Sequence, residues 1–222
     1  SEHQMGTLET PLGCAGEDVA TNRKPRDDEI DVYGLSDRGT VRARNEDHFL
    51  LASIHRRVNV IGTNLSELER LPLADQRLAF MAMVADGVGG ASGGDRASAI
   101  ALEIATQYVV SSMDCYERTG AVEGAMTDAL QSAALHCHQA VLDGATEEGD
   151  GSRMATTLTL WISVWPWYYL LQVGDSRYYL YRDGQLTQVT RDQTIAQELV
   201  DQGIFTRAIA ERSQFKNVLS SA

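Results

Sequence analysis

An α+β fold is predicted by two antiparallel hairpins and two long amphipathic segments. Four strand-like runs pair as two hairpins, residues 156–164 with 167–173 and residues 178–182 with 185–190. Asp183-Gly184 is typical of a tight hairpin turn, and Pro166 fits a turn because proline cannot donate to a ladder. Two further runs have apolar residues at helical spacing, residues 94–112 and 119–143. The antiparallel hairpins disfavour a parallel dinucleotide-binding sheet.

The first part of the chain combines a polar tail, two strands and an insertion. Residues 1–29 are polar and lack periodicity, so we expect a mobile tail ahead of one domain over residues 30–222. Strands are expected from Ile30 and over residues 47–54. Residues 55–76 are longer than a simple hairpin connection and have leucines at helical spacing, which indicates an insertion.

A buried strand is predicted to end at Asp86. Residues 78–85 are all apolar, which is typical of a strand buried on both faces, and Asp86-Gly87 follows them. An isolated Asp-Gly pair most often makes only a tight turn. Four more glycines between Val88 and Asp95 favour close approach of a ligand, after which the first long helix begins.

Two short helices are predicted near the end of the chain. Asp192 has a side chain suited to the N-cap of the first, which would run to Gln202 and stop at Gly203. Thr206 is suited to begin the second.

Carboxylates at strand ends indicate a divalent-metal site. Asp47 begins a strand, Asp86 ends another, and Asp175 lies between two apolar runs. A buried carboxylate is costly without a partner, and divalent cations prefer oxygen ligands. The neighbouring Glu46 points away from Asp47 in an extended strand, so both serve one site only if one acts through water. Arg42 suits bidentate phosphate binding, and a solvated surface arginine is the alternative.

The chain is acidic. Its 222 residues include 19 Lys and Arg against 31 Asp and Glu, which gives a net charge of −12. Nonspecific nucleic-acid binding depends on basic patches, so this balance argues against a nucleic-acid partner. A phosphorylated substrate would be repelled at long range, so metal ions and Arg42 must supply local positive charge. Without a run of eighteen apolar residues or a recognisable signal peptide, no membrane association is expected.

The cysteines do not indicate a disulfide framework or a zinc site. Cys14, Cys115 and Cys137 are odd in number and widely spaced, without a Cys-x-x-Cys pair, so we expect a reducing, cytoplasmic location. His136 and His138 flank Cys137, but side chains two residues apart on a helix diverge. An ordinary helix surface is therefore favoured over a metal site.

Six short segments follow one another in a specific order: residues 36–47 (SDRGTVRARNED), 85–90 (ADGVGG), 155–160 (ATTLTL), 173–177 (VGDSR), 180–186 (LYRDGQL) and 189–194 (VTRDQT). Each is weak alone, whereas the ordered set is specific. It resembles the metal-dependent protein phosphatases of type 2C, bacterial branch, from Val32 to about Ala222.

This resemblance implies a fold and an activity. The fold is a four-layer α/β/β/α sandwich of two antiparallel sheets flanked by helices. The activity is hydrolysis of phosphoserine and phosphothreonine monoesters by a water that bridges two metals, with Arg42 holding the substrate phosphate. The implied partners are phosphorylated proteins, themselves substrates of a Ser/Thr kinase, and a monomer is expected.

The resemblance also implies a metal-ligand set for two Mn²⁺ or Mg²⁺ ions. Asp86 would bridge both metals, Asp47 and the Gly87 carbonyl would be further ligands, and Glu46 would act through water. Asp47 and Asp86 are therefore the candidate catalytic residues. Asp175 resembles the ligand of a third, weaker metal.

The chain departs from the family pattern in several places. Val88 stands where some relatives have a histidine proposed as a general acid, so leaving-group protonation would fall to water or to another residue. Ala155 replaces the usual glycine. Two later motifs that complete the family's metal site are not found before the chain stops at Ala222, after an apolar-periodic stretch. We therefore expect a piece of a longer phosphatase that binds metal poorly as it stands.

Two other functions are considered. A catalytically inactive phosphatase-like module could bind phosphoproteins, although the retained Arg42, Asp47 and Asp86 argue against decay of an enzyme. A nucleotide-binding glycine loop over residues 87–94 is disfavoured because Ser92 occupies the position where that motif needs its last glycine.

Overall fold

The computed structural model describes residues 7–11, 23–57, 60–61, 63–64, 75–88, 93–119, 124–148, 154–216 and 218–220. Its main sheet is antiparallel, has the strand order β1-β6-β5-β3-β2 with β4 paired to β3, and contains β1 (Thr7–Pro11), β2 (Asp47–Arg56), β3 (Gln76–Val88), β4 (Ala155–Thr156), β5 (Leu158–Val164) and β6 (Trp167–Val173). A second, two-stranded antiparallel sheet consists of β7 (Tyr179–Arg182) and β8 (Gln185–Gln188). The predicted α+β class with antiparallel sheets is confirmed.

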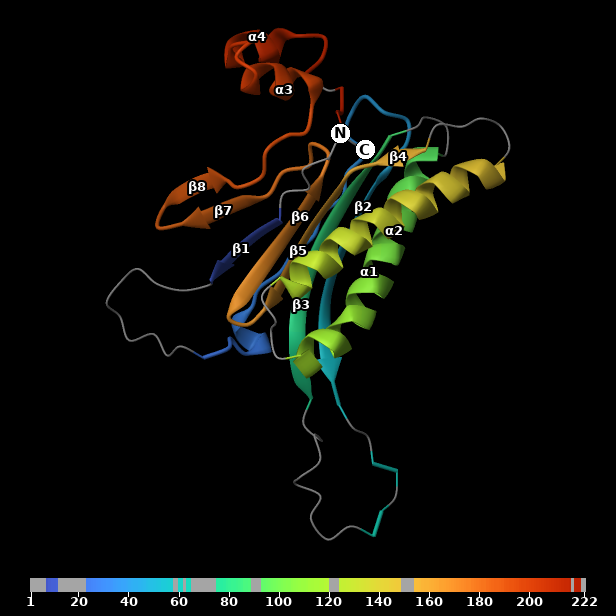
Figure 1. Cartoon of the computed structure of the whole chain (residues 1–222), viewed down its shortest axis with the longest axis vertical. Helices are drawn as coiled ribbons and strands as arrows, with labels where there is room; N and C mark the ends of the chain where they lie inside the picture. Colours follow the sequence, from blue (N-terminus) through green and yellow to red (C-terminus); the bar gives the residue numbers. More distant parts are fainter. Residues whose placement is uncertain are drawn as a thin grey trace.

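Two long helices, α1 (Gly93–Thr119) and α2 (Ala125–Glu148), run side by side along one face of the main sheet (Figure 1). Two short helices, α3 (Ile195–Asp201) and α4 (Arg207–Arg212), follow the β7–β8 ribbon, and a short 3₁₀ helix covers Asp27–Glu29. Within the described ranges, none of the helices combines the length and hydropathy needed to cross a bilayer.

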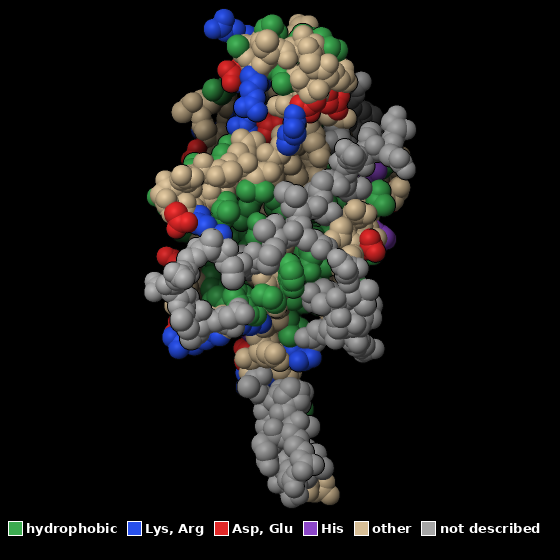
Figure 2. Space-filling view, turned by 60° about the vertical axis from the view of Figure 1, so that its left-hand side comes forward, with side chains coloured by type: hydrophobic (Ala, Val, Ile, Leu, Met, Phe, Trp, Pro, Cys, Tyr) green, Lys and Arg blue, Asp and Glu red, His purple; other side chains and the backbone are tan. Residues whose placement is uncertain are grey.

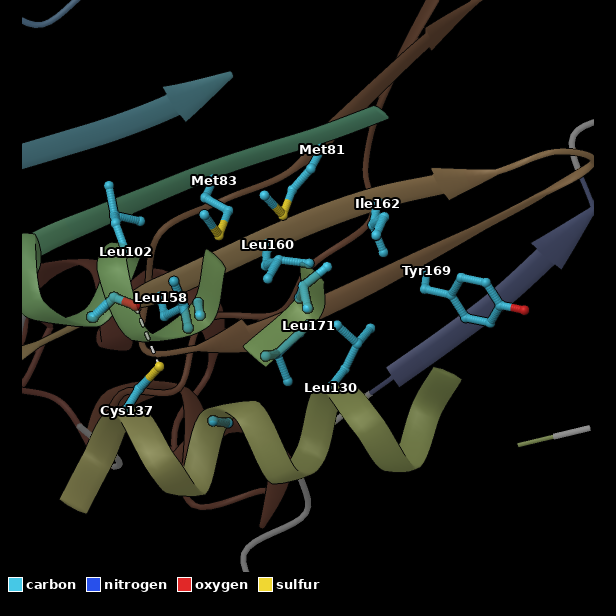
Figure 3. Close-up of a cluster of buried hydrophobic side chains, with 14 of the residues drawn as sticks. Met81, Met83, Leu102, Leu130, Cys137, Leu158, Leu160, Ile162, Tyr169 and Leu171 are labelled. Atoms are coloured by element: carbon cyan, nitrogen blue, oxygen red, sulfur yellow. Dashed lines mark hydrogen bonds between the residues drawn. The ribbon is translucent and has the colours of Figure 1, made fainter. Parts of the chain in front are cut away.

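The core lies between the main sheet and the α1–α2 pair. Figure 3 shows its apolar side chains, which come from β3, β5 and β6 on one side and from both helices on the other: Met81, Met83, Leu158, Leu160, Ile162, Tyr169, Leu171, Leu102, Leu130 and Cys137. Burial of each large apolar side chain contributes about 1.5–3 kcal/mol to folding. This layer therefore gives the sheet a rigid back.

Strand β3 is buried on one face only. Its burial alternates residue by residue, and Met81, Met83 and Ala85 are buried against the helices. The other face carries Val84, which is 43% exposed. The prediction of a strand buried on both faces is wrong, because only one face of this sheet is covered by helices in the described part of the chain. The strand also continues past Asp86 to Val88, where the sequence suggested that it ends.

The N-terminal 29 residues include ordered contacts that differ from the expected tail. Strand β1 pairs antiparallel with β6. Arg77 of β3 is buried, donates to the Pro25 carbonyl and forms an ion pair of 2.7 Å with Asp27. Because a buried guanidinium is costly without partners, Arg77 fixes residues 25–27 against the sheet. This long-range requirement is invisible in the local composition of the tail.

The strand expected from Ile30 is not present between Ile30 and Asp47. Val32, Tyr33 and Leu35 are 47%, 83% and 75% exposed, and no described strand pairs with their backbone. A strand needs a hydrogen-bonded partner, so extended apolar sequence alone does not form one.

The local turn and cap predictions have mixed outcomes. Both hairpins are confirmed, with φ of 51° at Asp183 and 78° at Gly184 in the second turn. Thr206 caps α4 as predicted. The cap of α3 is Thr194, which accepts from the Gln197 N–H, and not Asp192. Asp192 instead forms a two-point ion pair with Arg177.

Both long helices are displaced or extended relative to the sequence prediction. Helix α1 continues to Thr119, and α2 begins at Ala125. Most of the predicted insertion, including residues 65–74, lies outside the described residues, as does Cys14.

Candidate functional site

Two carboxylates face each other across neighbouring strands. In the antiparallel register of β2 and β3, Asp47 lies directly opposite Asp86. Directly opposed residues of an antiparallel pair project from the same face of the sheet. Here that face is the one turned away from α1 and α2, since Asp86 alternates with the buried Ala85. The site therefore lies on the side of the sheet that the long helices leave uncovered.

The electrostatics of this pair favour a cation. Burial raises the pKa of Asp86 to about 6, and the charge of Asp47 together with a hydrogen bond between the two groups raises it further. Arg42 acts in the opposite direction, and Asp175 adds a smaller increase. Two carboxylates that share a site repel when both are ionised, so a bound cation or a shared proton stabilises the arrangement.

The backbone of Asp86 is fixed by two threonines. Its N–H donates to Thr157 Oγ1 at 2.9 Å, and its carbonyl accepts from the Thr157 N–H at 2.9 Å and from Thr156 Oγ1 at 3.0 Å. Thr157 is fully buried, and its hydroxyl also lies 2.8 Å from Ser176 Oγ. These contacts join β3 to the loop that carries Asp175.

The entry to β2 is shaped by Asn45. Its side-chain oxygen accepts from the Asp47 N–H at 3.1 Å, and its amide nitrogen donates to Ser36 Oγ at 2.6 Å. An Asn two residues before a backbone N–H acceptor position is typical of an Asx turn, so this role could have been read from the sequence. It was not, because the carboxylates beside it drew the interpretation.

Gly87 marks the closest approach of β3 to α1. Its N–H donates to the Glu46 carbonyl at 3.2 Å. A Cβ at Gly87 would lie 2.0 Å from the Gly94 carbonyl oxygen, and a Cβ at Gly94 would lie 2.9 Å from Glu46 Oε2. Glycine is therefore required at both positions for Glu46 to lie where it does.

Glu46 and Arg42 form an ion pair beside the two aspartates. Arg42 Nη1 lies 3.5 Å from Glu46 Oε2, and the Glu46 side chain is only 11% exposed, against 63% for Arg42. Glu46 thus faces Arg42 and Gly94, away from the Asp47–Asp86 pair, which agrees with the expectation that the two neighbours diverge. The guanidinium keeps enough exposure to meet a ligand from solvent.

A cavity of about 300 Å³ opens at this point, and its lining includes Arg38, Arg42, Arg44, Glu46, Asp47 and Asp86. Arginine guanidinium groups and carboxylates therefore share one recess. The arginines suit an anion such as a phosphate, and the carboxylates suit a cation. Arg38 and Arg44 were considered only as surface charges from the sequence, because their spacing alone does not show that they turn toward Arg42.

Asp175 is adjacent to this site and lines a different cavity. Its charge reaches Asp86, but the residue borders a recess of about 760 Å³ between β8, α3 and α4. Basic and acidic side chains alternate there, including the Arg177–Asp192 pair, and charges of both signs are visible at the upper end of Figure 2. The structure thus brings Asp47, Asp86, Glu46, Gly87 and Arg42 together and leaves Asp175 at the margin.

The donor set fits a divalent cation in part. The facing pair of Asp47 and Asp86 supplies two carboxylates, and the raised pKa of Asp86 shows that the pair lacks compensating charge. Among the described residues, no group of three or more His, Cys, Asp or Glu side chains is arranged to hold a metal ion. The ligand roles assigned to Glu46, Gly87 and Asp175 therefore remain predictions.

Comparison with known proteins gives one family. The family model described as protein phosphatase 2C matches residues 73–216. The serine/threonine protein phosphatase PstP of Mycobacterium tuberculosis is 32% identical over 171 residues, which are 77% of this chain and 26% of the relative. The serine/threonine phosphatase stp of Listeria innocua is 28% identical over 189 residues, 84% of this chain and 64% of the relative. The chain thus spans about a quarter of the first relative and under two thirds of the second.

Solved structures agree. A crystal structure of M. tuberculosis PstP is 29% identical, has a TM-score of 0.59, and the alignment covers 85% of this chain and 65% of that one. The PstP catalytic domain in complex with two manganese ions is 30% identical with a TM-score of 0.53, covering 79% of this chain and 61% of that one. The match of a family model to well over half of the residues, together with the paired carboxylates, identifies the family: the chain belongs to the protein phosphatase 2C family.

Proposed function

We propose that the protein is a metal-dependent phosphoprotein phosphatase that hydrolyses phosphoserine and phosphothreonine monoesters. The observation that carries this proposal is the placement of Asp47 directly opposite Asp86 in one recess with Arg42. Carboxylates for a cation and a guanidinium for an anion are thereby offered to the same ligand. A phosphate monoester bound with divalent metal has both charges.

The residues divide into two roles. Asp47 and Asp86 would hold Mn²⁺ or Mg²⁺, as the manganese-bound PstP structure suggests for its relative. Bound divalent cations supply Lewis-acid chemistry, namely acidification of a water nucleophile and neutralisation of negative charge on the phosphoryl oxygens. Arg42 would bind the phosphate and orient it, held by Glu46 at 3.5 Å. Val88 cannot donate a proton, so water would protonate the leaving alkoxide.

The partners and location follow as further parts of the proposal. The names of the relatives, serine/threonine phosphatases, support phosphoproteins made by a Ser/Thr kinase as substrates. The acidic balance of the chain and the absence of a basic stripe argue against nucleic acid as a partner. We infer a monomer in the cytoplasm, consistent with unpaired cysteines in a reducing compartment.

The test is hydrolysis of an aryl phosphate and of a phosphothreonine peptide with Mn²⁺ titrated into the metal-free protein. We expect activity that depends on Mn²⁺ and is lost in EDTA. Asp86→Asn should lower kcat/KM by about a thousandfold or more, because it removes a shared metal ligand. Asp143→Asn is the matched control, since Asp143 is an exposed carboxylate on α2 that contacts only Gln139 among the printed partners.

A phosphoprotein-binding module without catalysis is the second candidate. It is favoured by the finding that only two carboxylates face each other in the described part of the site. Phosphopeptide binding that needs Arg42 but shows no Mn²⁺ dependence and no turnover would establish this module and refute the phosphatase. Near-normal turnover by Asp86→Asn would refute the assignment of Asp86.

A further inference from the structure

Ser98 lies behind the site, on the first turns of α1, and is fully buried. Its hydroxyl oxygen lies 2.6 Å from the Glu46 carbonyl oxygen, which also accepts the Gly87 N–H at 3.2 Å. It lies 3.0 Å and 3.1 Å from the carbonyls of Gly94 and Asp95. The shortest of these contacts crosses from the helix to the strand entry.

His48 completes the contact from the strand side. It follows Asp47 in β2 and is paired in register with Ala85, so its side chain is directed toward α1 while Asp47 is directed toward the site. His48 Nδ1 lies 2.9 Å from Ser98 Oγ, and Nε2 lies 3.7 Å from Asp95 Oδ1. His48 thus links the Asp47 strand to the same helix turn.

The number of protons fixes the direction of these hydrogen bonds. A serine hydroxyl has one proton to donate and lone pairs to accept. If His48 carries its proton on Nδ1, it donates to Ser98, and the Ser98 proton is free for the Glu46 carbonyl at 2.6 Å. In the other tautomer the hydroxyl would donate to Nδ1 and leave that carbonyl. The short contact therefore favours the Nδ1–H tautomer.

Ser98, His48 and Asp95 have the residue types of a hydrolytic triad, but Ser98 cannot act as a nucleophile. It is fully buried and does not line the 300 Å³ cavity. A nucleophile must reach the reacting atom within about 3–3.5 Å. Its role must therefore be exerted through the groups that it holds.

We propose that Ser98 and His48 are positioning residues for the metal and phosphate site. They hold the Glu46 carbonyl against the Gly87 N–H and so fix how β2 and β3 present Asp47 and Asp86. Neither residue touches substrate. The inference rests on the proposed function for its catalytic consequence, whereas the structural constraint can be measured without it.

The first test is Ser98→Ala in the whole protein. Loss of the buried donor to Glu46 should speed amide hydrogen exchange at Gly87, followed by NMR, by about tenfold. Mn²⁺ affinity measured by calorimetry should fall by about tenfold or more, and kcat should fall more than KM changes. Ser112→Ala is the matched control, because Ser112 Oγ donates to Tyr108 O on the same helix away from the site.

His48 gives an independent pair of variants. His48→Asn keeps an N–H close to the Nδ1 position, whereas His48→Phe keeps the ring and loses the donor. We expect the Phe variant to reproduce the effects of Ser98→Ala and the Asn variant to restore most of the wild-type behaviour. A purely bulk-packing role would give the opposite order.

The outcomes separate the two proposals. Gly87 exchange and Mn²⁺ affinity in Ser98→Ala and His48→Phe that match those of Ser112→Ala would overturn the positioning role. Faster Gly87 exchange and weaker Mn²⁺ binding in a protein that shows no phosphatase activity in any form would support positioning and refute the proposed function.

Discussion

Arg42 is the residue through which the site meets an anion from solvent. Its side chain is 63% exposed, and Glu46 is its one printed ion-pair partner at 3.5 Å. Arg42→Ala should raise KM for a phosphopeptide by about tenfold with a smaller change in kcat, because phosphate binding is lost more than transition-state charge stabilisation. Steady-state kinetics at saturating Mn²⁺ measures both constants.

The control for this change is Arg182→Ala, at the exposed end of β7. It removes the same charge from the molecule, so any effect of net charge on substrate attraction is common to both variants. Equal kinetics for Arg42→Ala and Arg182→Ala would show that Arg42 is a surface charge.

Asp86 should make the stability of the metal-free protein depend on pH. Burial and Asp47 raise its pKa from 3.8 to about 6, so between these values the folded protein holds more protons than the unfolded chain. The free energy of unfolding must then fall as pH rises through this window. Asp86→Asn cannot ionise and lacks this contribution.

Thermal unfolding in EDTA tests this sign. Relative to Asp86→Asn, the wild-type Tm should decline between about pH 4 and about pH 7, and added Mn²⁺ should reverse the decline at the upper end. Differences that stay constant with pH would mean that Asp47 does not face an ionised Asp86 in solution.

Residue types were more predictable than their roles. The sequence pointed to Asp47, Asp86 and Arg42 because carboxylates and a guanidinium beside apolar runs need partners. It could not place Ser98 at the site, since a serine on an amphipathic helix has no distinguishing local pattern. That contact arises only when α1 packs against the entry to β2.

At the scale of elements, the approach of β3 to α1 is the tightest constraint on the site. A Cβ at Gly87 would lie 2.0 Å from the backbone oxygen of Gly94, which cannot move without displacing the helix. Gly87→Ala should therefore lower the free energy of unfolding by about 2 kcal/mol or more. Chemical denaturation monitored by circular dichroism measures the change.

Gly144→Ala is the matched control in α2. A Cβ there would lie 3.1 Å from Cδ1 of Ile100, a flexible side-chain end, and alanine favours a helix interior. Its stability should stay within about 1 kcal/mol of the wild type. A Gly87→Ala protein as stable as this control would contradict the close approach of β3 and α1.

Elements that depend on neighbouring residues were predicted well, and those that depend on distant residues were not. The Asp183-Gly184 turn is set by its own backbone preference, so its hairpin could be read from the sequence. The segment from Ile30 has strand-like composition but lacks a described partner strand. Thr194 replaces Asp192 as a cap because Arg177, fifteen residues away in sequence, claims the Asp192 carboxylate.

At the scale of the whole molecule, an acidic chain has to attract an acidic substrate. The net charge is −12, yet Arg38, Arg42 and Arg44 meet at one cavity. Long-range repulsion falls off within about 10 Å at ordinary salt, so the arginines act only after encounter. The fold therefore separates overall charge from the charge that the ligand meets.

The hydrogen bonds at Asp86 have a consequence for folding order. Asp86 pairs with Asp47 across the sheet and is held by Thr157, which is 71 residues farther along the chain. Contacts of such long sequence separation form only after the intervening chain has been ordered, which makes them slow. A chain released from the ribosome only as far as α2 lacks Thr157 and cannot fix Asp86. Capture of a metal ion by this pair would thus mark the completion of folding and could not guide its early steps.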